Sequence, residues 1–382
     1  MSYDTKDSLK IGIALSGGGI RAAVFHLGVL ARLAEDGLLE QFAYLSSVSG
    51  GSLVTGLIYS LSCYKWPDSE KFKSMVFRKA RHTLTSTNIQ RDSLFRLLTK
   101  PQYIFQGKAK LISESLKKRW RIDKMIHDIP VHPRWAINAT TYETGKNWRF
   151  IPERMGDYIV KYTPNPKISL SDAIAASAAY PGLIGPLKLK TSKYKWFKFG
   201  KDKKLSVSVK QEDKLFHLWD GGVYDNLGTE ALYKPGKDPY HHKINFLLIS
   251  DASKSLENEK SMSFYKRAFR LVNISMDQVR SLRSRQLASH FIENDNTGAY
   301  LKMGYSPESI FRAWKMHPSN EPALIGDALD KSESDRAANY ATTLKRISEN
   351  DFDLIARHGW EVANYTLLAL CPNLFKHKKW VG

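Results

Sequence analysis

Apolar positions near the N-terminus switch between short continuous runs and helical spacing. Residues 11–15 form a buried-strand pattern, a glycine turn follows, and residues 20–36 repeat apolar side chains at helical intervals. The same order then returns, with a strand over 42–48, a small-residue turn at Ser49 and a helix over 53–61. Two consecutive strand–turn–helix units predict an α/β fold with a mostly parallel sheet. Because functional loops follow the carboxyl ends of parallel strands, both turns should lie at one sheet edge.

Later patterns extend this core. Residues 135–141 and 148–151 predict a hairpin, 171–180 a small-residue helix that Ser-Asp caps, and 215–219 and 244–250 two further strands. No internal repeat or long linker interrupts the chain. The pattern therefore favours one interwoven domain over two separate ones.

Two stretches depart from the core pattern and predict insertions. Residues 65–130 are basic with several helical pieces, and residues 187–214 are rich in lysine with interleaved aromatic side chains, which predicts an exposed hairpin that could also touch a membrane. After a long helix over 261–291, helical signals dominate. We expect a core over 9–250 that carries both insertions, followed by a mainly helical extension over 251–382 that packs on it.

Composition supports a large core and an anionic partner. Of 382 residues 42% are hydrophobic, and 58 basic against 38 acidic residues give a net charge of +20, which attracts nucleic acid, anionic headgroups or acidic metabolites. Two cysteines, Cys63 and Cys371, have no metal-ligand spacing and favour a reducing, cytoplasmic setting without a disulfide or metal. No secretory pattern and no apolar run of about eighteen residues is visible, so we expect only peripheral membrane contact, at the inner face.

Ser49 is the candidate nucleophile, although Ser-Gly-Gly-Ser is also ordinary loop composition. A strand, a sharp turn and a helix would expose its Oγ above the positive end of the helix. Gly17–Gly19 are candidate oxyanion donors, since backbone without Cβ atoms can approach a ligand closely, and Arg21 adds a positive charge. A dinucleotide-binding loop is the alternative, but Ala22 replaces its third glycine.

The candidate base is Asp220, which ends a strand and precedes two glycines. Asp-Gly-Gly is common in ordinary turns. A carboxylate with the usual pKa of about 3.9 is a weak base, so an apolar pocket would have to raise that pKa. Trp219 and Val223 are placed to supply such surroundings.

Five blocks, in this order, resemble the patatin-like phospholipases. They are Gly17–Arg21, Ser47–Gly51, Asn138–Gly145, Ala173–Pro181 and Asp220–Gly222. The resemblance covers roughly the predicted core, and five ordered blocks are far more specific than any single one.

The resemblance implies a three-layer α/β/α fold and a lipid acyl hydrolase of the phospholipase A type, without a metal or other cofactor. It implies a Ser49–Asp220 dyad and an oxyanion hole built from Gly17, Gly18 and Gly19. Ser47 departs from the usual first glycine of Gly-x-Ser-x-Gly, but serine is small enough for a tight elbow. The partner would be phospholipid or an anionic membrane surface. The supporting residues would be Arg21, Gly51, Gly221 and Gly222.

Two other hypotheses remain. An α/β-hydrolase triad could use His241 or His242, although only one strand precedes Ser49, whereas several do in that fold. Alternatively, a nucleotide could gate a bacterial effector phospholipase as a small-molecule activator, or a basic module could bind nucleic acid over a vestigial hydrolase core. The arginines around Arg280, Arg283 and Arg285 would then be the place to look. We expect no stable nucleic-acid complex, and the pattern leaves the oligomeric state open.

Overall fold

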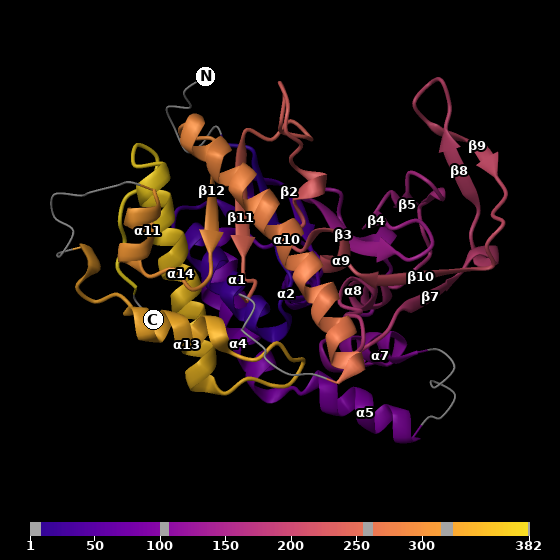
Figure 1. Ribbon diagram of the computed structural model, residues 1–382, viewed down its shortest axis with the longest axis horizontal. Coiled ribbons are helices and arrows are strands. Elements are labelled where there is room, and N and C mark those ends of the chain that lie inside the picture. Colours follow the sequence, from indigo (N-terminus) through magenta and orange to yellow (C-terminus); the bar gives the residue numbers. More distant parts are fainter. Residues whose placement is uncertain (1–8, 100–106, 255–262, 315–323, 381–382) are drawn as a thin grey trace.

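The computed structural model describes residues 9–99, 107–254, 263–314 and 324–380. The twelve described strands join in one sheet, and five neighbouring parallel strands form one end of it (Figure 1). In spatial order these are β12 (Gly298–Lys302), β11 (Phe246–Asp251), β1 (Ile11–Leu15), β2 (Phe42–Ser47) and β3 (Arg134–Thr141).

Antiparallel strands continue the sheet beyond β3. They follow in the order β4 (Lys146–Ile151), β5 (Arg154–Asp157), β6 (Lys161–Pro164), β8 (Trp196–Phe199) and β9 (Leu205–Val209). A side branch consists of β10 (Leu215–Asp220), which pairs with both β3 and β7 (Leu187–Lys190).

Helices cover both faces of the sheet, which confirms the three-layer α/β/α class (Figure 1). One face packs against α1 (Gly19–Ala34), α2 (Gly50–Leu61), α8 (Leu170–Ser177) and α14 (Glu349–Leu370). The other packs against α9 (Gly222–Asp225) and α10 (Phe264–Glu293). The remaining described helices are α3 (Ser69–Lys71), α4 (Phe77–Ser86), α5 (Ile89–Thr99), α7 (Lys108–Arg119), α11 (Pro307–Ala313) and α13 (Lys331–Asn339).

Alternation along the central strands explains the two apolar layers. Ile13 of β1 and Leu248 of β11 belong to the layer beneath α1, whereas Ala14 and Ile249, one residue later, belong to the layer that Leu287 of α10 completes. A strand that is buried on both faces reads as a continuous apolar run, as the sequence of β1 does. None of the described helices is long and apolar enough to cross a membrane.

The C-terminal region contributes a strand as well as helices. Strand β12 pairs in parallel with β11, and α14 packs along α1, so this region builds part of the sheet and of one helical layer. The sequence pattern did not predict β12. It also misplaced the start of α8: Ser169, rather than Ser171, is the N-cap, and its hydroxyl accepts a hydrogen bond from the Asp172 amide at 3.1 Å.

Within the lysine-rich stretch over 187–214, β8 and β9 pair as an antiparallel hairpin. Its tryptophan, however, is a core residue: Trp196 is buried, and its ring meets those of Trp148 and Phe216 edge to face. Aromatic side chains in this stretch therefore serve packing as well as any surface role.

Candidate active site

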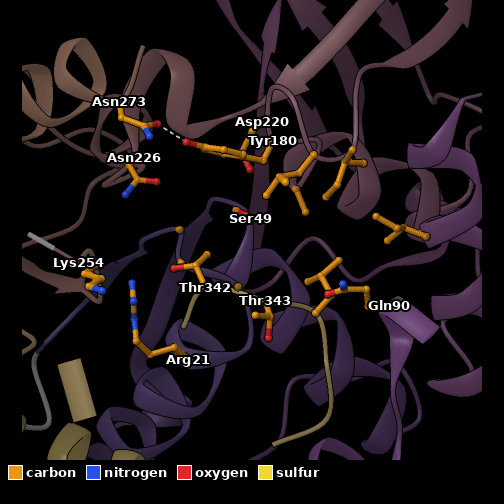
Figure 2. A pocket seen from close by; sticks show the side chains of 18 of the residues that line it. Arg21, Ser49, Gln90, Tyr180, Asp220, Asn226, Lys254, Asn273, Thr342 and Thr343 are labelled. Atoms are coloured by element: carbon orange, nitrogen blue, oxygen red, sulfur yellow. Dashed lines mark hydrogen bonds between the residues drawn. The ribbon is translucent and has the colours of Figure 1, made fainter. Parts of the chain in front are cut away.

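Strands β2 and β10 pair with the same edge of β3: β2 pairs with its first half and β10 with its second half. Ser47, the last residue of β2, lies opposite Ile137, and Asp220, the last residue of β10, lies opposite Ala139. Because β2 runs parallel and β10 antiparallel to β3, their carboxyl ends point at each other. Ser49, two residues beyond β2, therefore meets Asp220 across this junction (Figure 2).

Ser49 adopts a backbone conformation that side-chain-bearing residues rarely enter, with φ 47° and ψ −110°. Such a residue costs about 1–3 kcal/mol and persists only where its surroundings impose it. Here α2 begins at the next residue and lies close to β1: a Cβ on Gly51 would stand 2.3 Å from the Leu15 carbonyl oxygen. The predicted sharp turn is thus an elbow, with Ser49 at its apex.

A chain of buried hydrogen bonds between serine hydroxyls stabilises this elbow. The Ser49 amide donates to Ser177 Oγ at 2.9 Å, and that oxygen lies 2.9 Å from Ser52 Oγ. Ser52 Oγ in turn lies 2.8 Å from Ser47 Oγ, which accepts a hydrogen bond from Trp135 Nε1 at 2.8 Å. All four side chains beneath Ser49 are buried. Ser47, the departure from the family's glycine, therefore satisfies a buried indole donor that glycine would leave unpaired.

Asp220 is buried, and burial raises its pKa to about 7. A hydrogen bond from the Gly222 amide, at 2.7 Å to Oδ1, and the adjacent Ser49 side chain offset part of that rise in pKa. The adjoining Gly221 amide donates to the Ser177 carbonyl at 3.2 Å, so α8 steadies this strand end as well as the elbow. A carboxyl that titrates near neutral pH and contacts a hydroxyl can act as its base.

The glycine turn differs from expectation at one of its three positions. The Gly17 amide already donates to the Asn226 carbonyl at 3.1 Å, so it is not free to serve as an oxyanion donor. Gly17 instead provides room, since a Cβ there would stand 2.4 Å from Asn226 Oδ1. Gly18 and Gly19 have φ of 142° and 62°, and no residue within the described ranges accepts from their amides.

Arg21 is buried at the start of α1 and lines a cavity above Ser49. Its guanidinium donates to the carbonyl oxygens of Tyr340 at 2.8 Å and Ala252 at 3.1 Å. Burial lowers its pKa to about 10, although Asp251 opposes that change. The side chain thus connects the glycine turn to two later parts of the chain.

A cavity of about 720 Å³ opens above Ser49. In Figure 2, Ser49 lies between Asp220 and Tyr180 on one side and Thr342 and Thr343 on the other. One wall is apolar and is formed by Leu94, Leu97, Leu111, Ile112, Leu183 and Ile184. The opposite side is polar and carries more cations than acids, with Arg21, Asn226, Lys254, Arg270, Asn273, Asp277 and Arg280.

Several residues at the site were not among those that the sequence predicted for it. The Tyr180 hydroxyl donates to Asn273 of α10 (Figure 2), and the Thr343 carbonyl accepts from the Ile20 amide at 3.0 Å. Ser177 and Tyr180 belong to the Ala173–Pro181 block, but that block assigned neither of them a role. Asn226, Asn273 and Thr343 lie in no recognised motif. Only the fold identifies these five residues as part of the site.

The two histidines of the triad hypothesis lie elsewhere. His242 stacks on Tyr44, in the first half of β2, with ring centroids 4.2 Å apart, whereas Ser49 follows the other end of that strand. Over the described ranges no histidine lines the cavity. Neither His241 nor His242 is therefore placed to activate Ser49.

Two arginines of the nucleotide hypothesis are paired with acids. Arg280 contacts Asp277 at 2.6 Å and Asp251 at 3.3 Å. Arg283 contacts Glu230 at 3.1 Å and lies 3.5 Å from Asp225. Their charge is therefore largely balanced within the fold.

Comparison with known proteins agrees with this fold. A family model described as "Patatin-like phospholipase" matches residues 13–233, more than half of the chain. The chain belongs to this family, whose members are lipid hydrolases. A shorter match, 43% identical over 49 residues, is to "Putative meiotic phospholipase SPO1" of Saccharomyces cerevisiae; it covers 13% of this chain and 8% of that protein.

Among solved structures, the human GIVD cytosolic phospholipase A2 has a similar fold. It superposes with a TM-score of 0.51 at 14% identity, and the match covers 97% of this chain and 61% of that one. The same enzyme in complex with methyl gamma-linolenyl fluorophosphonate gives 0.50 at 16% identity, with 97% and 59% covered. The present chain thus spans about three fifths of the length of this enzyme.

Proposed function

We propose that this protein is a phospholipase A-type acyl hydrolase in which Ser49 and Asp220 form a catalytic dyad. The observation that carries the proposal is the meeting of the two residues at the β2–β10 junction, with Asp220 buried beside the Ser49 side chain (Figure 2). Family membership supplies the reaction class, and the geometry supports these residues for the individual roles.

The reaction would begin when ionised Asp220 accepts the Ser49 proton and Ser49 Oγ attacks the ester carbonyl. The negative charge that develops on the carbonyl oxygen would be stabilised by the Gly18 and Gly19 amides and by the N-terminal end of α1. The proton on Asp220 then passes to the leaving alcohol. Water, deprotonated by the same carboxylate, attacks the acyl-enzyme; the proton then passes from Asp220 to Ser49 Oγ as the fatty acid leaves.

The cavity walls fit a phospholipid substrate. The apolar wall would hold an acyl chain, and the opposite side, with Arg21 and Lys254, would face the phosphate (Figure 2). This division supports a membrane phospholipid over a neutral, soluble ester as the natural substrate.

Intact-mass detection of a fluorophosphonate adduct tests the dyad directly. We expect one adduct on the wild type, none on Ser49→Ala, and much slower labelling of Asp220→Asn, because an amide cannot accept the proton. Ser60→Ala is the matched control: Ser60 lies on the same helix, and its hydroxyl donates to the Trp120 carbonyl at 2.7 Å, so labelling should persist. An adduct that survives Ser49→Ala would overturn the assignment.

A further inference from the structure

Apolar side chains are exposed around the mouth of the cavity. On α5, Leu94, Phe95 and Leu98 are 60%, 63% and 76% exposed. Leu94 also lines the cavity, so the apolar wall continues from the interior onto the surface. Clustered exposure of large apolar residues beside a binding cavity is characteristic of an interaction surface rather than of ordinary protein exterior.

A second group of exposed apolar residues continues this pattern at the mouth. Leu183 is 66% exposed and lines the cavity, and its carbonyl accepts from Lys108 Nζ, at the start of α7, at 3.3 Å. The adjoining Gly182 packs against the ring of Phe269, an exposed residue near the start of α10. Figure 1 shows α5, α7 and this end of α10 at the same end of the molecule.

From this arrangement we infer that the mouth rim, defined as Leu94, Phe95, Leu98, Leu183 and Phe269, docks on the surface of an anionic bilayer. The inference rests on the proposed function, because it explains how a membrane lipid reaches Ser49. With the rim in the interfacial layer, an acyl chain passes along the apolar wall into the cavity without entering water.

Charge around the rim favours an anionic bilayer over an apolar protein partner. Arg91 on α5 and Arg267 on α10 are exposed, and Lys108, Lys254 and Arg270 line the cavity. Cations next to inserted apolar side chains are the arrangement that binds anionic headgroups. The net charge of +20 adds long-range attraction to the same kind of surface.

The lysine-rich hairpin, β8 and β9, is the alternative membrane-binding surface. Strands β8 and β9 lie at the upper right of Figure 1, away from α5 at the lower edge. The hairpin supplies charge, but it does not border the cavity above Ser49. Docking through the rim, in contrast, delivers the lipid directly to the catalytic residues.

Sedimentation with vesicles distinguishes the mouth rim from the lysine-rich hairpin as the membrane-binding surface. The measurement uses the Ser49→Ala variant, so that no lipid is hydrolysed. The vesicles contain phosphatidylcholine and phosphatidylserine in equal parts. We expect Leu98→Glu to weaken binding by about tenfold, since it replaces an inserted leucine by a charge. Phe95→Glu should do the same. Leu282→Glu, at an equally exposed position farther along α10, and Val207→Glu, on the hairpin, should bind like the parent.

Unchanged binding of both α5 variants, or weaker binding of the Val207→Glu variant alone, would overturn the inference. In the active protein, Leu98→Glu should retain turnover of p-nitrophenyl butyrate, a soluble ester, and lose turnover of vesicle lipid. An equal loss of turnover for both substrates would mean that Leu98→Glu damaged the fold or the site. The same two turnover measurements on Phe95→Glu would then decide between rim docking and such damage. Absence of all ester hydrolysis in the wild type would contradict the proposed function, whereas the vesicle-binding result would stand by itself.

Discussion

The backbone amide of Ser49 donates a hydrogen bond to the hydroxyl oxygen of Ser177 at 2.9 Å. The Ser177 carbonyl accepts a hydrogen bond from the amide of Gly221, the residue after Asp220, at 3.2 Å. One residue at the end of α8 thus contacts the backbone beside both members of the proposed dyad. Ser177 is therefore a positioning residue, since it touches neither reacting atom but fixes the segments that carry them.

Ser177→Ala should lower kcat by about tenfold and leave KM for a soluble ester almost unchanged, because a small displacement of a nucleophile is costly in rate. The free energy of unfolding should fall by about 1–3 kcal/mol, since the Ser49 amide loses its partner. Ser171→Ala is the control: Ser171 is buried on the same helix and accepts a hydrogen bond from Ser113 at 3.1 Å. An equal loss of kcat in both variants would show that Ser177 acts through stability alone.

The pKa of Asp220 predicts how activity depends on pH. Burial raises this pKa to about 7, and only the ionised carboxylate can accept the Ser49 proton. We expect kcat/KM for a soluble ester to rise with one ionisation near neutrality and to level off above it, measured from about pH 5 to 9. A rate that is already maximal at the acidic end would contradict a buried Asp220 as the base.

The same burial predicts a pH-dependent stability difference between wild type and Asp220→Asn. The carboxyl binds its proton more tightly in the folded state, where its pKa is about 7, than in the unfolded state, where it is 3.8. Its contribution to stability is therefore fully present below the unfolded pKa and is lost as pH rises through the folded pKa. Relative to Asp220→Asn, the wild type should lose up to about 4 kcal/mol between these pH values, measured by denaturant unfolding. A difference that stays constant with pH would contradict the prediction.

Restoring the family's usual glycine at position 47 should destabilise this protein. Ser47→Gly leaves Trp135 Nε1 buried without an acceptor and should cost about 1–3 kcal/mol in unfolding free energy. Trp135→Phe removes the donor instead, and the double variant should be more stable than the sum of the two single losses predicts. Strict additivity in this double-mutant cycle would show that the indole–hydroxyl contact contributes nothing.

The sequence by itself determined the parallel core and the identity of the two candidate catalytic residues. Continuous apolar runs such as residues 11–15 and 246–249 are what strands buried on both faces require. Ser49 was recognisable because a nucleophile elbow is a local structure, encoded by a strand, small turn residues and a helix. Asp220 was recognisable through its Asp-Gly-Gly block and the order of the five blocks, since Asp-Gly-Gly alone is common in turns.

The tertiary structure decided everything that depends on residues distant in the chain. Gly17 looked equivalent to its two neighbours until the fold placed the Asn226 carbonyl against its amide. Similarly, Ser177 and Thr343 reach the site through long-range packing that no local pattern encodes. The meeting of Ser49 and Asp220 has the same origin: both strand ends share an edge of β3, and pairing between distant strands depends on register and topology rather than on local sequence.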